Sequence, residues 1–185
     1  PKPAEPKPAE PYWDGSLLAR GYRQIAAYDY TDAEGSLLYQ VVRYEHATEK
    51  KTFLQRSPDG SGGWLKGAGK RKVLYRWPDV ARAVHDTVFV TEGEKDADRL
   101  AALGFVATTV ASGKWSDDVV RPLAGKLACI LEDNDEAGRK RALAAAEALS
   151  GIAAQVRIVR LPCLPEGGDV SDWLDEDPCR SAQLV

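Results

Sequence analysis

Methionine does not occur in the 185 residues, not even at the start, so we expect the sequence to be an excised segment of a longer protein. Cysteine occurs three times, at Cys129, Cys163 and Cys179. This odd number without Cys-x-x-Cys spacing indicates neither a disulfide framework nor a zinc ribbon. No apolar run approaches the ~18 residues that cross a bilayer, and no signal-peptide pattern is present. We therefore expect a protein of the reducing cytoplasm without a membrane partner.

Hydrophobic residues make up 44% of the chain, which is enough for a sizeable core in one domain or in a small domain with an appended one. The first eleven residues repeat the unit Pro-Lys-Pro-Ala-Glu and cannot form such a core. Their composition favours an extended, semi-rigid spacer, or a disordered tail in isolation. We assign residues 1–20 to this linker or tail and expect another domain upstream.

Short β runs dominate the next part of the chain, residues 21–85. The runs 25–30 and 37–44 flank a loop, Thr31-Asp-Ala-Glu-Gly, that suits a hairpin because it ends in glycine. A third strand is expected at 51–56, followed by a loop rich in glycine and serine. We therefore predict a small β-rich subdomain over 21–85.

Positive charge is concentrated in residues 50–76, where eight basic residues stand against a single acid, Asp59. The basic residues are Lys50, Lys51, Arg56, Lys66, Lys70, Arg71, Lys72 and Arg76. Phe53, Trp64, Tyr75 and Trp77 lie among or beside them, a combination that suits a nucleic-acid backbone with unstacked bases. Our candidates for these contacts are Trp64, Lys66, Lys70, Arg71 and Lys72. The alternative is a solvated loop whose aromatic side chains pack inward.

Strands alternate with helices over residues 86–178. The expected strands are 88–90, 105–110, 127–131 and 155–161, and the main expected helices are 94–103 and 137–149. This alternation predicts an α/β domain with a parallel sheet flanked by helices, followed by a short tail at 179–185.

Acidic residues follow two of the expected strands. Glu92 comes after the strand at 88–90, and Asp133 and Asp135 come after the strand at 127–131. Because ligands of open parallel sheets bind beyond the carboxyl ends of the strands, these side chains should meet at one edge. Mg²⁺ prefers such carboxylate oxygens, so a metal site is expected there. The competing interpretation is that acids in these positions cap helices and interact with the helix dipole.

Three acidic segments occur in order, and together they carry a resemblance to a known family. They read Glu92-Gly-Glu-Lys-Asp-Ala, then Asp133-Asn-Asp-Glu-Ala-Gly-Arg, then Gly168-Asp-Val-Ser-Asp-Trp-Leu. This arrangement resembles the Toprim domain shared by bacterial-type primases, topoisomerases and some nucleases. The sequences of these segments are most similar to those of phage and plasmid primases and primase-helicases. The basic β segment over 22–77 also resembles the part that precedes Toprim in those proteins.

The resemblance implies a role for each matching position. Glu92 corresponds to the proposed general acid or base, which also lies near the metals. Asp96 lies one helical turn further on and faces the same edge, so it is a second catalytic candidate. The expected ligands of Mg²⁺ or Mn²⁺ are Asp133, Asp135, Asp169 and Asp172, although the spacing of the last two leaves open which of them reaches the metal. The expected contacts to nucleotide phosphates or to the acidic cluster are Lys95, Ser112, Gly113, Lys114 and Arg139.

The function that the resemblance implies is that of a DNA primase catalytic core of the phage or plasmid type. Such a core makes RNA primers from NTPs on a single-stranded DNA template, with helicase and template-recognition domains elsewhere in the parent protein. One alternative is another Toprim enzyme, either a nuclease or a topoisomerase-like enzyme, although strand passage needs a tyrosine nucleophile on large additional domains. The other is a nucleic-acid-binding module that is inactive without its partner domains.

Overall fold

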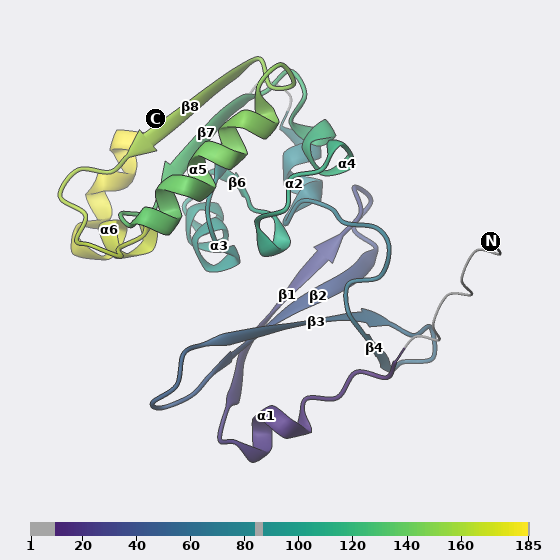
Figure 1. Cartoon of the computed structure of the whole chain (residues 1–185). Coiled ribbons are helices and arrows are strands. Elements are labelled where there is room, and N and C mark those ends of the chain that lie inside the picture. Colours follow the sequence, from purple (N-terminus) through teal and green to yellow (C-terminus); the bar gives the residue numbers. More distant parts are fainter. Residues whose placement is uncertain (1–9, 84–86, 185) are drawn as a thin grey trace, which may run out of the picture. The chain divides into compact units, whose positions relative to one another are not determined.

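The computed structural model describes residues 10–83 and 87–184, which form two compact units (Figure 1). The β unit contains the described residues up to Tyr30 together with Ser36–Arg71. The α/β unit contains Thr31–Gly35 and the described residues from Lys72 onward. The Pro-rich repeat up to residue 9 and the predicted boundary between residues 85 and 86 lie outside the described residues.

A four-stranded sheet forms the β unit, in the order β1-β2-β3-β4. Its elements are α1 (Gly15–Ala19), β1 (Arg23–Thr31), β2 (Leu37–Glu45), β3 (Thr52–Pro58) and β4 (Trp64–Lys66). β3 is antiparallel to both β2 and β4, with Val42 of β2 opposite Leu54 of β3. Val42 and Tyr44 are fully buried and form a small core with Tyr22. The three strands predicted from the sequence are confirmed, and β4 was missed because it is only three residues long.

Residues 10–20 belong to the β unit, whereas the sequence predicted a linker or tail over 1–20. The backbone N–H of Tyr12 donates to the carbonyl of Trp64 (2.9 Å), and the N–H of Lys66 donates to the carbonyl of Glu10 (2.8 Å). The hydroxyl of Tyr12 is also hydrogen-bonded to that of Tyr44. The physical reason is that an edge strand offers unpaired backbone groups, and this segment pairs with those of β4.

The α/β unit is built on a second four-stranded sheet, in the order β6-β5-β7-β8, and all of its strand pairs are parallel. Its strands are β5 (Thr87–Val90), β6 (Val106–Thr108), β7 (Leu127–Glu132) and β8 (Gln155–Arg160). Its α-helices are α2 (Trp77–Arg82), α3 (Glu94–Ala102), α4 (Asp117–Val120), α5 (Glu136–Leu149) and α6 (Val170–Glu176). Short 3₁₀ turns are η1 (Ala111–Gly113), η2 (Arg121–Leu123) and η3 (Pro178–Leu184). The predicted α/β class and parallel sheet are confirmed.

The core of this unit lies between the sheet and α5. Ala142, Ala145 and Leu149 form the buried face of α5 and pack in one cluster with Val88 of β5 and Ile130 of β7. From β5 the chain crosses to β6 on one side, and from β7 it crosses to β8 on the other. The carboxyl ends of β5 and β7 therefore flank the point where the strand order reverses, which is where open α/β sheets bind their ligands.

The predicted tail at 179–185 is ordered over its described part, up to Leu184. η3 follows α6, and the guanidinium of Arg180 donates to the carbonyl of Trp173 (3.0 Å) and lies 5.4 Å from the centre of its ring. Trp173 is itself buried. No helix in the described part of the chain is both long enough and apolar enough to span a membrane.

Candidate functional site

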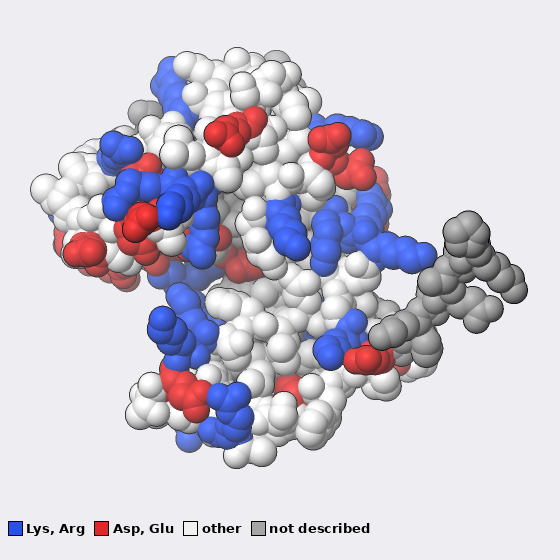
Figure 2. Space-filling model, viewed as in Figure 1, with Lys and Arg blue, Asp and Glu red and all other residues white. Residues whose placement is uncertain are grey.

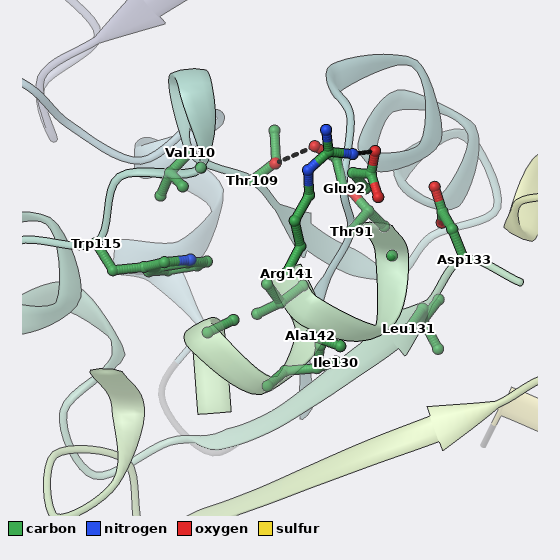
Figure 3. A pocket seen from close by; sticks show the side chains of 14 residues that line it. Thr91, Glu92, Thr109, Val110, Trp115, Ile130, Leu131, Asp133, Arg141 and Ala142 are labelled. Atoms are coloured by element: carbon green, nitrogen blue, oxygen red, sulfur yellow. Dashed lines mark hydrogen bonds and ion pairs between the residues drawn. The ribbon is translucent and has the colours of Figure 1, made fainter. Parts of the chain in front are cut away.

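A hollow lies at the reversal point of the parallel sheet, between the ends of β5 and β7 and the first turns of α5 (Figure 3). Its apolar side includes Val110, which follows β6, and Trp115. Its charged side includes Glu92, Asp133 and Arg141. The hollow thus combines an apolar wall with both signs of charge, as small-molecule sites commonly do.

Glu92 lies two residues beyond the end of β5, and hydrogen bonds hold the turn on which it is carried. The hydroxyl of Thr91 donates to the carbonyl of Gly93 (3.0 Å), and the hydroxyl of Thr109 donates to the carbonyl of Glu92 (3.1 Å). The carboxylate Oε1 of Glu92 is ion-paired with the guanidinium of Arg141 (Figure 3). Its Oε2 is buried and accepts no hydrogen bond from any described residue. Glu92 therefore presents one engaged and one unengaged oxygen.

Arg141 lines the hollow and was not assigned by the sequence analysis, which assigned Arg139 on the same helix. Arg139 is exposed on α5, whereas Arg141 extends across the hollow to Glu92 (Figure 3). A signal was present in the helical spacing, because Gly138, Ala142 and Ala145 follow the i, i+4, i+7 pattern of one helix face and Arg141 falls at i+3 of the same face. A basic residue within an otherwise small and apolar face indicated a functional position.

Asp133 follows β7 directly and lines the hollow. The pKa of its carboxyl is raised from the ordinary 3.8 to about 7, first by burial and then by the nearby carboxylates of Asp96, Asp169 and Asp135, against the opposing effect of Lys95. Several carboxyl groups are thus close enough to disfavour each other's charge. Glycine at position 138 lets α5 pack closely against the end of β7, because a Cβ there would lie 2.5 Å from the backbone oxygen of Asp133.

Asn134 connects the end of β7 to the loop before α6. Its backbone N–H donates to the carbonyl of Gly168 (3.0 Å), and its carbonyl accepts from the N–H of Gly167 (2.9 Å). Its side-chain amide donates to the carbonyl of Leu164 (2.7 Å). These bonds bring the third acidic segment to the second, so Asn134 has a structural role that the sequence analysis did not assign.

Three of the predicted metal ligands take part in capping helices. Asp135 is the N-cap of α5, where it accepts a hydrogen bond from the N–H of Gly138 (2.6 Å). Asp169 and Asp172 form a capping box at the start of α6, each accepting from the other's N–H at 3.0 Å. Each carboxylate has a second oxygen that the cap does not use. The capping interpretation of these acids is therefore present in the structure, and metal binding by them stays a prediction.

Lys95 and Asp96, in the first turn of α3, interact with α6. The ammonium of Lys95 lies 2.7 Å from Asp169 Oδ2 and 3.5 Å from Asp96 Oδ1. Asp96 is buried and accepts a hydrogen bond from the hydroxyl of Ser171 (2.5 Å). Burial and the charge of Asp169 raise the pKa of Asp96 to about 6, although Ser171 and Lys95 act in the opposite direction. Asp96 thus joins α3 to α6 and is not part of the wall of the hollow.

The donor chemistry of the site fits a divalent cation. All candidate ligands are carboxylate oxygens, which hard cations such as Mg²⁺ prefer. The unengaged Oε2 of Glu92 and the mutual repulsion at Asp133 are features that a cation would relieve. Among the described residues, however, no three His, Cys, Asp or Glu side chains are already grouped for metal binding. Glu92 and Asp133 are the residues that would hold the ion, with Asp135 and Asp169 beside them.

The predicted phosphate loop follows β6. Ser112 and Gly113 both adopt positive φ angles, 61° and 62°, and Gly113 lines the hollow. Lys114 is exposed, and the pKa of Lys72 is lowered by burial and then by the positive charge of Lys114. Two ammonium groups are therefore near each other beside this loop.

Trp64 and Lys66, two of the candidate template contacts, have partners within the β unit. The guanidinium of Arg56 lies 4.3 Å from the centre of the Trp64 ring and 5.2 Å from that of Tyr12. Lys66 lies 3.2 Å from Glu10, while Lys70 and Arg71 are exposed. Figure 2 shows that Lys and Arg side chains lie in several groups on the face in view, some with Asp or Glu beside them.

No family model and no curated protein matches the sequence. The solved structures that are similar to the chain include two primases. One, the Aquifex aeolicus primase with its zinc-binding and RNA polymerase domains, has a TM-score of 0.66 and 22% identity over 88% of this chain. The other, the RNA polymerase domain of Mycobacterium tuberculosis primase DnaG, has a TM-score of 0.60 and 18% identity over 95% of this chain. The chain shares the fold of these primase RNA polymerase domains. It spans 38% of the first structure's length and 66% of the second's.

Proposed function

We propose that this chain is the catalytic core of a DNA primase, which joins NTPs into short RNA primers on single-stranded DNA. The observation that carries the proposal is the meeting of Glu92 and Asp133 in a hollow at the reversal point of the sheet. The likeness to primase RNA polymerase domains supports it at the level of the fold. The three acidic segments have sequences similar to those of Toprim domains, and this similarity favours the phage and plasmid type.

The chemistry of primer synthesis fits the charges of the site. A bound Mg²⁺ or Mn²⁺ would offset the negative charge that builds on the transferring phosphoryl group. Glu92 and Asp133 would hold this ion, and the carboxylate of Glu92 would also accept the proton of the attacking 3′-hydroxyl. Asp96 and Ser171 act at one remove by fixing α3 against α6.

The substrates would contact residues around the hollow and in the basic segment 50–76. Lys114, Ser112 and Gly113 are proposed to bind the triphosphate, with Lys95 and Arg139 as further cations. Lys66, Lys70, Arg71, Lys72 and Trp64 are proposed to contact the template strand. Helicase and template-recognition domains of the parent protein would supply DNA unwinding and choice of start site.

A specific observation favours a second candidate, a nucleic-acid-binding module that is inactive without partner domains. Arg141 and Lys95 already neutralise Glu92 and Asp169, and three of the acids cap helices. In this alternative the acidic cluster stabilises the fold and performs no chemistry alone.

Primer synthesis distinguishes the two candidates. The protein is incubated with single-stranded DNA, labelled NTPs and Mg²⁺ or Mn²⁺, and the products are resolved by length. We expect RNA oligomers from the parent protein and a loss of roughly 100-fold or more with Glu92→Gln, because the proton acceptor is removed while the shape is kept. Circular dichroism and template affinity should be unchanged in this variant. Synthesis at the parental rate by Glu92→Gln would reject the assigned role, and template binding without any synthesis by the parent would support the inactive module.

A further inference from the structure

The ion pair between Arg141 and Glu92 links α5 to the end of β5 across the hollow (Figure 3). The Arg141 side chain is 56% exposed and that of Glu92 is 26% exposed, so the pair lies at the open side of the hollow. The guanidinium takes Oε1, while Oε2 remains buried without a partner among the described residues. The charge of Arg141 thus partly compensates the carboxylate of Glu92, and the same carboxylate is also a suitable ligand for a divalent cation.

We infer that Arg141 is an internal counter-ion of Glu92, which competes with the divalent cation and, when displaced, binds a phosphate group of the nucleotide in the same hollow. This inference rests on the metal-binding part of the proposed function. It makes Arg141 a binding residue for the anionic substrate and a regulator of metal affinity.

The chemistry of arginine supports both positions of the side chain. A guanidinium stays charged at any physiological pH, and its planar fork matches a carboxylate and a phosphate equally well. It repels a divalent cation bound to the same carboxylate, because like charges a few ångströms apart interact strongly near a protein surface. Binding of the cation at Glu92 therefore weakens the ion pair between Glu92 and Arg141. The released guanidinium then needs another negatively charged partner, which a phosphate group of the nucleotide supplies.

The position of Arg141 on α5 makes this role specific to it. Arg141 shares the face of Gly138, Ala142 and Ala145, which lines the hollow. The preceding residue, Lys140, carries the same charge but is exposed and pairs with Glu136 at 2.6 Å on the same helix. Lys140 therefore provides a matched control, because its removal changes the net charge equally without touching the hollow.

The inference predicts coupled binding of metal and nucleotide. In the parent protein, the metal should raise the affinity for a triphosphate by more than direct metal–phosphate contacts provide, because it also releases Arg141. In Arg141→Met, the metal should bind more tightly in the absence of nucleotide, and the triphosphate should bind more weakly when metal is saturating. The coupling between the two ligands should therefore be reduced.

Mn²⁺ titration followed by electron paramagnetic resonance tests the first part. We expect Arg141→Met to raise Mn²⁺ affinity roughly 3- to 10-fold, because one repelling charge is removed from the site. Lys140→Met should change it by less than about 2-fold, because an exposed charge outside the hollow is screened. With a non-hydrolysable NTP analogue and saturating Mn²⁺, Arg141→Met should lose about 10-fold in nucleotide affinity, whereas Arg141→Lys should lose less because the charge is kept.

Thermal melting gives a second readout. Without metal, Arg141→Met should melt at a lower temperature than the parent, because Glu92 loses its counter-ion, and Mn²⁺ should stabilise the variant by more than it stabilises the parent. A folded Arg141→Met whose Mn²⁺ affinity is unchanged or weaker overturns the inference, since Arg141 would then position Glu92 and not compete for it. These measurements do not need primer synthesis. If they succeed but no primers form, the proposed function fails and the counter-ion role stands; if the parent binds no Mn²⁺, both fail.

Discussion

The pKa values of two neighbouring carboxyl groups of the site, Asp133 and Asp169, are shifted in opposite directions. Asp133 is shielded from solvent and faces other acids, so its pKa is raised to about 7. Burial also acts to raise the pKa of Asp169, but the ammonium of Lys95 and the N–H of Asp172 outweigh this effect and lower it. The difference follows from the partners, because Lys95 is bonded to Asp169 and only approaches Asp133 through space. The position of Lys95 thus favours the charged form of Asp169 over that of Asp133 when no metal is bound.

Asp133 makes the metal-free protein sensitive to pH. Its folded pKa of about 7 exceeds the ordinary 3.8, so between these values the folded state binds more protons than the unfolded state. Stability should therefore rise as pH falls from about 8 to about 5. We expect melting in the presence of a chelator to show this trend, and Asp133→Asn to show a smaller slope. Asp96, whose pKa is raised to about 6, leaves a remaining slope of the same sign. An equal slope in Asp133→Asn would contradict the assignment.

The starts of the helices position the acidic residues. α5 begins at the Asp135 cap and packs against the end of β7 through Gly138. α6 begins at the capping box of Asp169 and Asp172. An acid at a helix start both satisfies a free N–H and interacts favourably with the helix dipole. The same side chains that predicted a metal site therefore also define where two helices begin.

The cap and the metal ligand can be separated at Asp135. Asp135→Ala should destabilise the protein by about 1 kcal/mol, because the N–H of Gly138 loses its acceptor. Asp135→Asn keeps an oxygen at the cap and should retain most of the stability while removing the negative charge. Chemical denaturation of both variants without metal measures the loss of the helix cap. Mn²⁺ titration of Asp135→Asn measures the effect of the removed negative charge on metal binding. Equal stability of the Ala and Asn variants would show that the cap contributes nothing.

Charge is unevenly distributed over the whole molecule. The net charge of −3 conceals the strongly basic segment 50–76, whereas the candidate metal site in the α/β unit is acidic. Some of the basic residues have internal acidic partners, as Lys66 has in Glu10, but Lys70 and Arg71 are exposed. A nucleic-acid strand would compete with such exposed ion pairs at little cost, since these pairs contribute little stability.

Salt dependence tests the proposed template contacts. Each phosphate neutralised on a single strand contributes about −0.7 to the log–log slope of affinity against salt. Changing Lys66, Lys70, Arg71 and Lys72 to Ala should therefore flatten the slope by up to about 3 units. Trp64→Ala should instead weaken binding by roughly 1 to 3 kcal/mol with an unchanged slope. Fluorescence anisotropy over a salt series separates the two, and melting checks that Trp64→Ala still folds, because Arg56 stacks on this ring. An unchanged slope in the quadruple variant would show that these four side chains do not contact the phosphates of the template.

Local patterns in the sequence predicted most of the strands and the two longest helices, and they placed the acids after the strands. The strands and helices of the α/β unit follow from apolar runs and helical periodicity, which depend only on neighbouring residues. The expectation that Glu92 and Asp133 approach one edge follows from the parallel sheet. Both residues do line the hollow at the ends of β5 and β7.

The tertiary structure decided which distant residues meet. The strand order β6-β5-β7-β8 places Arg141 across from Glu92, and Asn134 beside the loop before α6. Recognising that Arg141 lines the hollow required knowing which face of α5 packs on the sheet. Recognising residues 10–12 as part of the β unit required knowing that β4 has a free edge. These pairings join residues far apart in the chain, so they depend on packing and strand order, which local periodicity does not encode.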